Sequence, residues 1–114
     1  MNNIDKGRLG EEVAKRYLEK EGINIVDRNY RIKNGEIDII GYQKDELIFI
    51  EVKSRSNIKY GYPSEAVNRD KIKTIKNVAN YYINSNYILN KNIRFDVIEV
   101  YLVDKKIHHI INAF

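Results

Sequence analysis

Residues 36–53 read Glu-Ile-Asp-Ile-Ile-Gly-Tyr-Gln-Lys-Asp-Glu-Leu-Ile-Phe-Ile-Glu-Val-Lys, and this stretch decides the fold. Two runs rich in β-forming residues, 36–42 and 47–53, flank the polar segment 43–46. That composition and loop length are typical of a β-hairpin. The second run begins apolar on both faces, as do strands that are buried inside a sheet. We therefore predict an interior hairpin that carries acids and a lysine toward its open end.

The hairpin register gathers two acids and a lysine. With the polar segment as the loop, Tyr42 pairs with Leu47, and counting back along both strands places Asp38 directly opposite Glu51. Opposed residues of an antiparallel pair share a face, with Cβ atoms about 5 Å apart. Lys53 lies two residues beyond Glu51 and shares that face. We therefore expect these three side chains to lie in one place.

This grouping of charges indicates a metal site. Two opposed carboxylates repel each other and lose solvation at the end of an apolar strand. A divalent cation reverses that penalty, because Mg²⁺ is commonly held by one or two carboxylates together with water and phosphate. Asp38 and Glu51 are thus candidate ligands of Mg²⁺ or Mn²⁺, and Lys53 is placed to orient a water or to offset charge on a phosphate. The alternative is that Glu51 and Lys53 are solvent-facing residues of a half-exposed strand. The same register makes Glu36 the partner of Lys53.

The rest of the chain predicts two helices and further strands. We expect helices over 7–21 and 68–84, and strands over 23–31, 36–42, 47–53, 93–103 and 106–112. Each helix carries a stripe of apolar residues at helical spacing: Leu9, Val13, Ala14, Tyr17 and Leu18 in the first, and Ile72, Ile75, Ala79, Tyr82 and Ile83 in the second. The order α-β-β-β-α-β-β predicts an α/β protein whose central mixed β-sheet is flanked by helices, with a crossover through the second helix.

Composition narrows the class of protein. The 114 residues suit one domain, and a hydrophobic content of 43% excludes a disordered chain. The absence of cysteine excludes a disulfide framework, cysteine-ligated zinc and a thiol nucleophile. A net charge of +4 favours polyanionic partners, although a mixed solvated surface explains it equally well. No stretch approaches the roughly 20 apolar residues of a membrane helix, so we expect a cytoplasmic protein without membrane contact.

Basic and aromatic residues follow the candidate site along the chain. Arg55, Lys59 and Tyr60 come directly after the second hairpin strand, in a combination that suits phosphate contacts and base stacking. Further on, Arg69, Lys71 and Lys73 begin the second helix and could form a phosphate-binding stripe. The alternatives, a polar loop and a merely solvated helix face, remain open for both groups. Likewise, Asp96 either stabilises the sheet or lines the site.

Three segments resemble a known nuclease signature. Residues 35–40, Gly-Glu-Ile-Asp-Ile-Ile, followed by 49–55, Phe-Ile-Glu-Val-Lys-Ser-Arg, resemble the PD-(D/E)xK signature, with Ile37 where the name-giving proline would stand. The helix 7–14 is similar to the opening helix of that group. Nearly the whole chain resembles the YraN-type family of bacterial proteins, which is similar to the archaeal Holliday-junction resolvases.

The resemblance implies a fold, a site and an activity. It implies a single domain over 1–114 with a restriction-endonuclease-like fold, in which Asp38 and Glu51 bind the metal and Lys53 is the catalytic lysine. It also implies that Glu11 reaches the metal directly or through water, whereas by itself Glu11 reads as a surface residue. The expected activity is divalent-metal-dependent hydrolysis of DNA, branched DNA included, with RNA left open. Cutting a four-way junction would require a homodimer. The alternative is a non-catalytic nucleic-acid-binding or assembly module.

Overall fold

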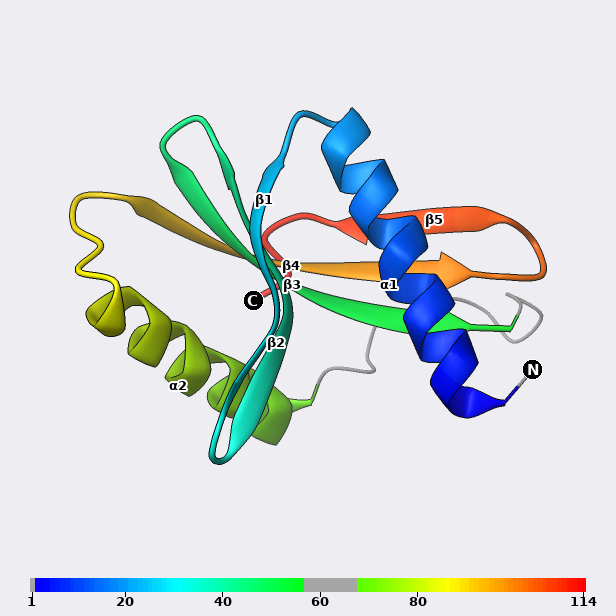
Figure 1. Ribbon diagram of the computed structural model, residues 1–114, viewed down its shortest axis with the longest axis horizontal. Coiled ribbons are helices and arrows are strands. Elements are labelled where there is room, and N and C mark those ends of the chain that lie inside the picture. The colour runs from blue at the N-terminus through cyan, green and yellow to red at the C-terminus, as the bar shows by residue number, and fades with distance from the viewer. Residues whose placement is uncertain (1, 57–67) are drawn as a thin grey trace.

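Five strands form one mixed sheet in the order β1-β2-β3-β4-β5 (Figure 1). The structure is a computed structural model that describes residues 2–56 and 68–114. Its elements are α1 (Asn3–Lys20), β1 (Asn24–Ile32), β2 (Gly35–Gln43), β3 (Glu46–Arg55), α2 (Arg69–Ser85), β4 (Asn92–Tyr101) and β5 (Lys106–Ile110). Neighbouring strands are antiparallel except β3 and β4, which are parallel and are joined through α2. The predicted fold class, element order and crossover are therefore confirmed.

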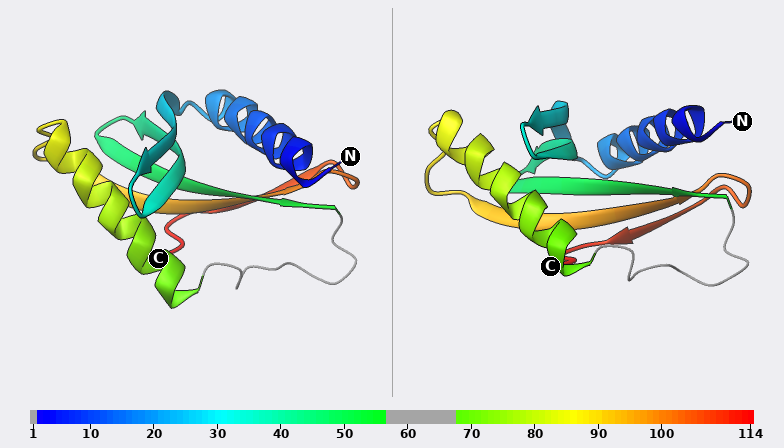
Figure 2. Two further views of the ribbon diagram at one scale, coloured as in Figure 1. Left: turned by 60° about the horizontal axis from the view of Figure 1, so that its bottom comes forward. Right: turned by 90° about the horizontal axis from the view of Figure 1, so that it is seen from below.

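The two helices cover different faces of the sheet. Alternate residues of β3 enter different cores: Ile48 and Ile50 pack in the cluster that contains α1 residues, whereas Leu47 and Phe49 pack in the cluster that contains α2 residues. Figures 1 and 2 show α1 over the β3–β4–β5 end of the molecule and α2 beside the β1–β2 end. The central strand is therefore buried on both sides, as its apolar sequence predicts.

Helix α1 begins earlier and packs differently than its sequence suggests. The side chain of Asn2 caps the helix by accepting the N–H of Asp5 at 2.8 Å, so the helix starts four residues before the predicted residue 7. The buried line along α1 runs through Gly10, Ala14 and Leu18, while Leu9 is 41% exposed. The predicted stripe was thus displaced by one position, because apolar periodicity assigns no packing role to a glycine.

Neither described helix has the length and apolarity to cross a membrane.

A buried polar network joins α1 to strands β4 and β5. Asp96 is fully buried and accepts two hydrogen bonds from the Arg94 guanidinium, both at 2.9 Å. His109 Nε2 lies 2.8 Å from the same carboxylate, and His109 Nδ1 lies 3.0 Å from the hydroxyl of Tyr17 on α1. Burial opposes ionisation of Asp96, but these hydrogen bonds outweigh it and lower its pKa below the usual range. Asp96 therefore stabilises the sheet.

Candidate active site

The site forms where β2 separates from β3. Pairing between the two strands runs from Gln43 opposite Glu46 to Ile39 opposite Ile50, which is the predicted register. Beyond that point β2 continues only with β1, and the β1–β2 ribbon crosses away from β3 (Figure 1). The printed sequence gave no sign of this separation, because periodicity reports which face a residue occupies and not where two strands part.

The separation changes how Asp38 meets β3. Asp38 and Glu51 do not form the predicted cross-strand pair, since the ladder ends one residue earlier. The Asp38 side chain instead reaches across the gap, and its Oδ2 accepts the backbone N–H of Val52 at 2.8 Å. A carboxylate thus takes the place of a ladder carbonyl, which satisfies an N–H that would otherwise be left without a partner. Asp38 and Glu51 therefore still come together, but through the reach of the Asp38 side chain and not through backbone pairing.

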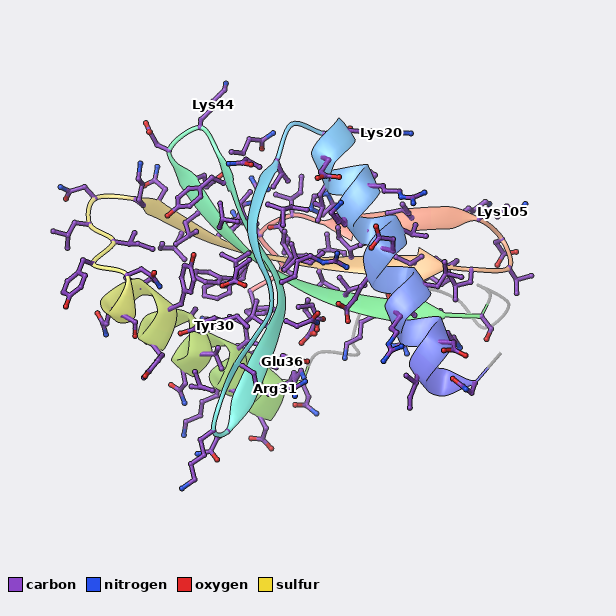
Figure 3. The ribbon with its side chains drawn as sticks, viewed as in Figure 1. Lys20, Tyr30, Arg31, Glu36, Lys44 and Lys105 are labelled. Carbon is purple, nitrogen blue, oxygen red and sulfur yellow. The ribbon has the colours of Figure 1, made fainter. Side chains whose placement is uncertain are left out.

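Glu36 is also placed differently from the prediction. It pairs with Arg31 across β1 and β2, and Arg31 Nε donates to its carboxylate at 2.9 Å (Figure 3). The predicted opposition of Glu36 and Lys53 is therefore wrong, for the same reason that applies to Asp38. Once β2 has left β3, its first residues belong to the β1–β2 ribbon alone.

Asp38 and Glu51 form a buried acid pair. Their exposed fractions are only 8% and 7%. Burial, followed by the hydrogen bond and the negative charge of Glu51, raises the pKa of Asp38 to about 9. Asp38 therefore keeps its proton at neutral pH when no cation is present. Oε2 of Glu51 is buried and accepts no hydrogen bond from the described residues, although Lys71 Nζ lies 3.4 Å away as an ion-pair partner.

The acid pair opens onto a cavity of about 340 Å³ between α1 and the parting strands. This volume is within the range of pockets that bind small ligands. Lysine, acids and backbone share its wall, which is formed by Lys6, Gly7, Glu11, Asp38, Glu51, Val52 and Ser54. Sequence reasoning missed Lys6, whose Nζ also donates to Ser56 Oγ at 2.8 Å. The early helix start was the missing signal, because it places Lys6 one turn before Gly10 on the face that meets β3.

Glu11 lies at this cavity but is held by another residue. Its Oε1 accepts a hydrogen bond from Asn29 Nδ2 at 2.8 Å, and its charge helps to raise the pKa of Asp38. Within residues 2–56 and 68–114, no three acids or histidines are close enough to form a metal site. Two carboxylates nevertheless suit Mg²⁺, which takes its other ligands from water and substrate phosphate. The buried Glu51 oxygen without a hydrogen-bond donor also fits a cation, so the donor set is compatible with Mg²⁺ or Mn²⁺.

Lys53 lies next to the site rather than in its wall. It is half-buried, and it is paired in register with Glu99 on the parallel neighbour β4. Strand alternation gives it the same face as Glu51, as predicted. It does not line the cavity that Asp38 and Glu51 share. Its catalytic role therefore stays a prediction, which a substitution can test.

The other predicted basic residues are dispersed. Lys71 is brought to Glu51, whereas Arg69 and Lys73 are exposed on α2. Arg55 is half-buried at the end of β3. The remaining two candidates, Lys59 and Tyr60, lie outside the described residues. Of the four proposed nucleic-acid contacts that the structure describes, only Lys71 therefore lies within ion-pair distance of Glu51.

Comparison with known proteins gives the family. A family model described as "Uncharacterised protein family UPF0102" matches residues 10–100. A UPF0102 protein of Clostridioides difficile (strain 630) is 60% identical over 114 residues, which is 100% of both chains. UPF0102 proteins of Alkaliphilus oremlandii and Caldanaerobacter subterraneus are 50% and 41% identical, and the matches cover 95% and 100% of this chain and 96% and 98% of theirs. The chain thus belongs to the UPF0102 family, which confirms the YraN-type resemblance.

Proposed function

We propose that this protein is a divalent-metal-dependent endonuclease that hydrolyses phosphodiester bonds in DNA, branched DNA included. The observation that carries the proposal is the buried pair of Asp38 and Glu51, which opens onto a cavity that Lys6 also lines and which has Lys71 as an ion-pair partner. Such a pair is costly for a fold to maintain, since burial and like charge both oppose its ionisation. A cation between the carboxylates removes that cost, and a cation is what phosphodiester hydrolysis needs.

Each residue then has a defined task. Asp38 and Glu51 would hold Mg²⁺ or Mn²⁺, and the N–H of Val52 fixes the orientation of the Asp38 carboxylate. The bound metal would supply a water of lowered pKa and would stabilise charge on the phosphate oxygens. Lys6, on the cavity wall, can pair with a backbone phosphate. Lys53, on the same strand as Glu51, would orient the attacking water or offset the developing charge.

The proposal is tested by cleavage assays on purified protein. Linear, nicked, flapped and four-way DNA, with RNA of matching sequence, are incubated with Mg²⁺, Mn²⁺ or EDTA. We expect metal-dependent cutting of DNA, and for Lys53→Ala a rate at least about a hundredfold lower, as for loss of one transition-state charge contact. Lys44→Ala, at the exposed β2–β3 turn, is the matched control (Figure 3). Equal cutting by the Lys53→Ala and wild-type proteins would overturn the catalytic role of Lys53, and equal cutting by Asp38→Ala would mean that a contaminant is responsible.

The position of Lys53 favours a second candidate function. Because Lys53 does not line the cavity, the chain also suits a nucleic-acid-binding or assembly module that keeps the fold without turnover. In that case DNA or RNA binding would survive both Lys53→Ala and Asp38→Ala. It would weaken steeply with salt, as phosphate contacts do. No substrate in the panel would then be cut with either metal.

The preferred substrate determines which oligomeric state and which cellular compartment we expect for the protein. Cutting both strands of a four-way junction requires two sites, which a symmetric dimer supplies. β5 is an edge strand of the sheet and could pair with its copy. Cross-linking with and without four-way DNA tests this dimer. A DNA substrate would also place the protein in the cytoplasm, where bacterial DNA lies.

A further inference from the structure

A lysine stands at the oxygen that a metal would take. Lys71 Nζ lies 3.4 Å from Glu51 Oε2, the buried oxygen that accepts no hydrogen bond from the described residues. The contact crosses a long stretch of chain, from the first turn of α2 to the interior of β3. At this distance the ammonium acts as a counter-charge without hydrogen-bond geometry. It is therefore held by charge alone, which a stronger cation can replace.

The backbone of Lys71 is held in the helix cap, whereas its side chain is partly exposed to solvent. The side chain of Asn68 caps α2 by accepting the N–H of Lys71 at 2.9 Å. The Lys71 side chain is 42% exposed, whereas that of Glu51 is 7% exposed. Half-exposed ion pairs of lysine contribute little to stability. Release of the ammonium would therefore disturb neither the helix nor the sheet.

We infer that Lys71 is a displaceable counter-ion of the acid pair, which a divalent metal replaces and which then binds a backbone phosphate of the nucleic acid. The inference rests on the proposed function, because it takes Glu51 as a metal ligand. A metal on Glu51 Oε2 and an ammonium beside that oxygen repel each other. The long flexible stem of lysine lets the ammonium turn outward to a phosphate. Metal binding and substrate binding are thereby coupled through one residue.

The first test measures metal affinity without any substrate. Mn²⁺ is titrated into wild type, Lys71→Met, Lys71→Arg and Lys73→Met, with binding followed by the electron paramagnetic resonance of free Mn²⁺. Removing the competing charge should tighten Mn²⁺ binding by Lys71→Met about two- to fivefold, the upper part of the range for one partly exposed charge contact. The charge-retaining Lys71→Arg should stay close to wild type. Lys73→Met makes the same charge change on the exposed face of α2 and should shift affinity less than twofold.

The second test asks whether release creates a phosphate contact. DNA binding is measured against salt concentration with Ca²⁺, another oxygen-preferring cation, and again with EDTA. We expect Lys71→Met to lower the salt slope by about 1 with Ca²⁺ and to leave it unchanged in EDTA. An equal loss under both conditions would show that Lys71 binds phosphate without being released, and would overturn the coupling.

The outcomes separate this inference from the proposed function. Wild-type protein that binds no Mn²⁺ would overturn both. Wild-type binding together with unchanged or weaker binding by Lys71→Met would overturn the counter-ion role alone. Circular dichroism and thermal melts of each variant confirm that an altered affinity does not come from an altered fold.

Discussion

The buried proton of Asp38 predicts an unusual dependence of stability on pH. A carboxyl whose pKa is raised on folding keeps a proton that the unfolded chain has lost. For Asp38 this window runs from its ordinary value of 3.8 to about 9. Within it the native state binds more protons than the unfolded state, so the free energy of unfolding must fall as the pH rises. Most carboxylates, which are stabilised by partners, behave in the opposite way.

The size of the effect follows from the linkage relation. One retained proton gives a slope of about 1.4 kcal/mol per pH unit, so stability should fall by about 4 kcal/mol between pH 5 and pH 8. That is a large share of the roughly 5–15 kcal/mol by which small proteins are stable. Asp38→Asn mimics the protonated acid, since its amide oxygen can still accept the Val52 N–H while its NH₂ group faces Glu51. The variant should be the more stable protein at pH 8.

The assay is urea denaturation in EDTA at pH 5, 6, 7 and 8. The difference between Asp38→Asn and wild type isolates the titration of the coupled acid pair, because groups outside the pair contribute nearly equally to both proteins. Asp45→Asn is the control, as Asp45 has a side chain that is 90% exposed. Curves for Asp38→Asn and wild type that stay parallel across the series would refute the retained proton of Asp38, and with it the argument that the acid pair favours a cation.

Three further predictions concern the same fold and site. Gly10→Ala should cost about 1–3 kcal/mol in urea denaturation, because its Cβ would lie 1.7 Å from Ser54 Oγ, and adding Ser54→Ala should recover part of the loss. Asp96→Asn should cost about 3 kcal/mol or more at pH 7, since it leaves the Arg94 charge without its buried partner; a loss below about 0.5 kcal/mol would contradict this. In urea denaturation, Mn²⁺ at a hundredfold excess over its Kd should raise the free energy of unfolding of wild type by about 2.7 kcal/mol and leave that of Glu51→Gln unchanged.

The sequence was sufficient for the architecture because each element has a strong local signal. The apolar runs of the hairpin fix its register from Gln43 opposite Glu46 onward, and the observed pairing follows it. His108 and His109 are adjacent on β5, so strand alternation places them on different faces of the sheet, where they contact Glu99 and Asp96. Helix starts were less predictable. Asn2, Asn3 and Asp5 are all of residue types that cap helices, and three-dimensional packing selects among them.

The candidate site was predictable in its two acids but not in its lysines or in its geometry. Asp38 and Glu51 were paired by counting along a regular hairpin, and the structure brings them together although the hairpin is not regular there. Lys71 could not have been assigned to Glu51, since no local pattern links the start of a helix to a strand twenty residues earlier. Lys6 was missed because the predicted helix began at residue 7, after it. Contacts across the chain depend on how the layers pack, which periodicity does not record.

The separation of β2 from β3 is what makes a cation site possible at this point. In a continuous ladder, neighbouring strands lie about 4.8 Å apart and backbone hydrogen bonds fill the space between them. Here β2 keeps its pairing with β1, so the ribbon twist draws it away and leaves a gap beside Glu51. Asp38 closes the backbone side of that gap through the Val52 N–H, and its carboxylate brings a second negative charge against Glu51. The gap is therefore flanked by apolar residues of β2 and β3 and has two carboxyl groups at its centre. A proton, the Lys71 ammonium or a metal can neutralise their negative charge, whereas water alone cannot.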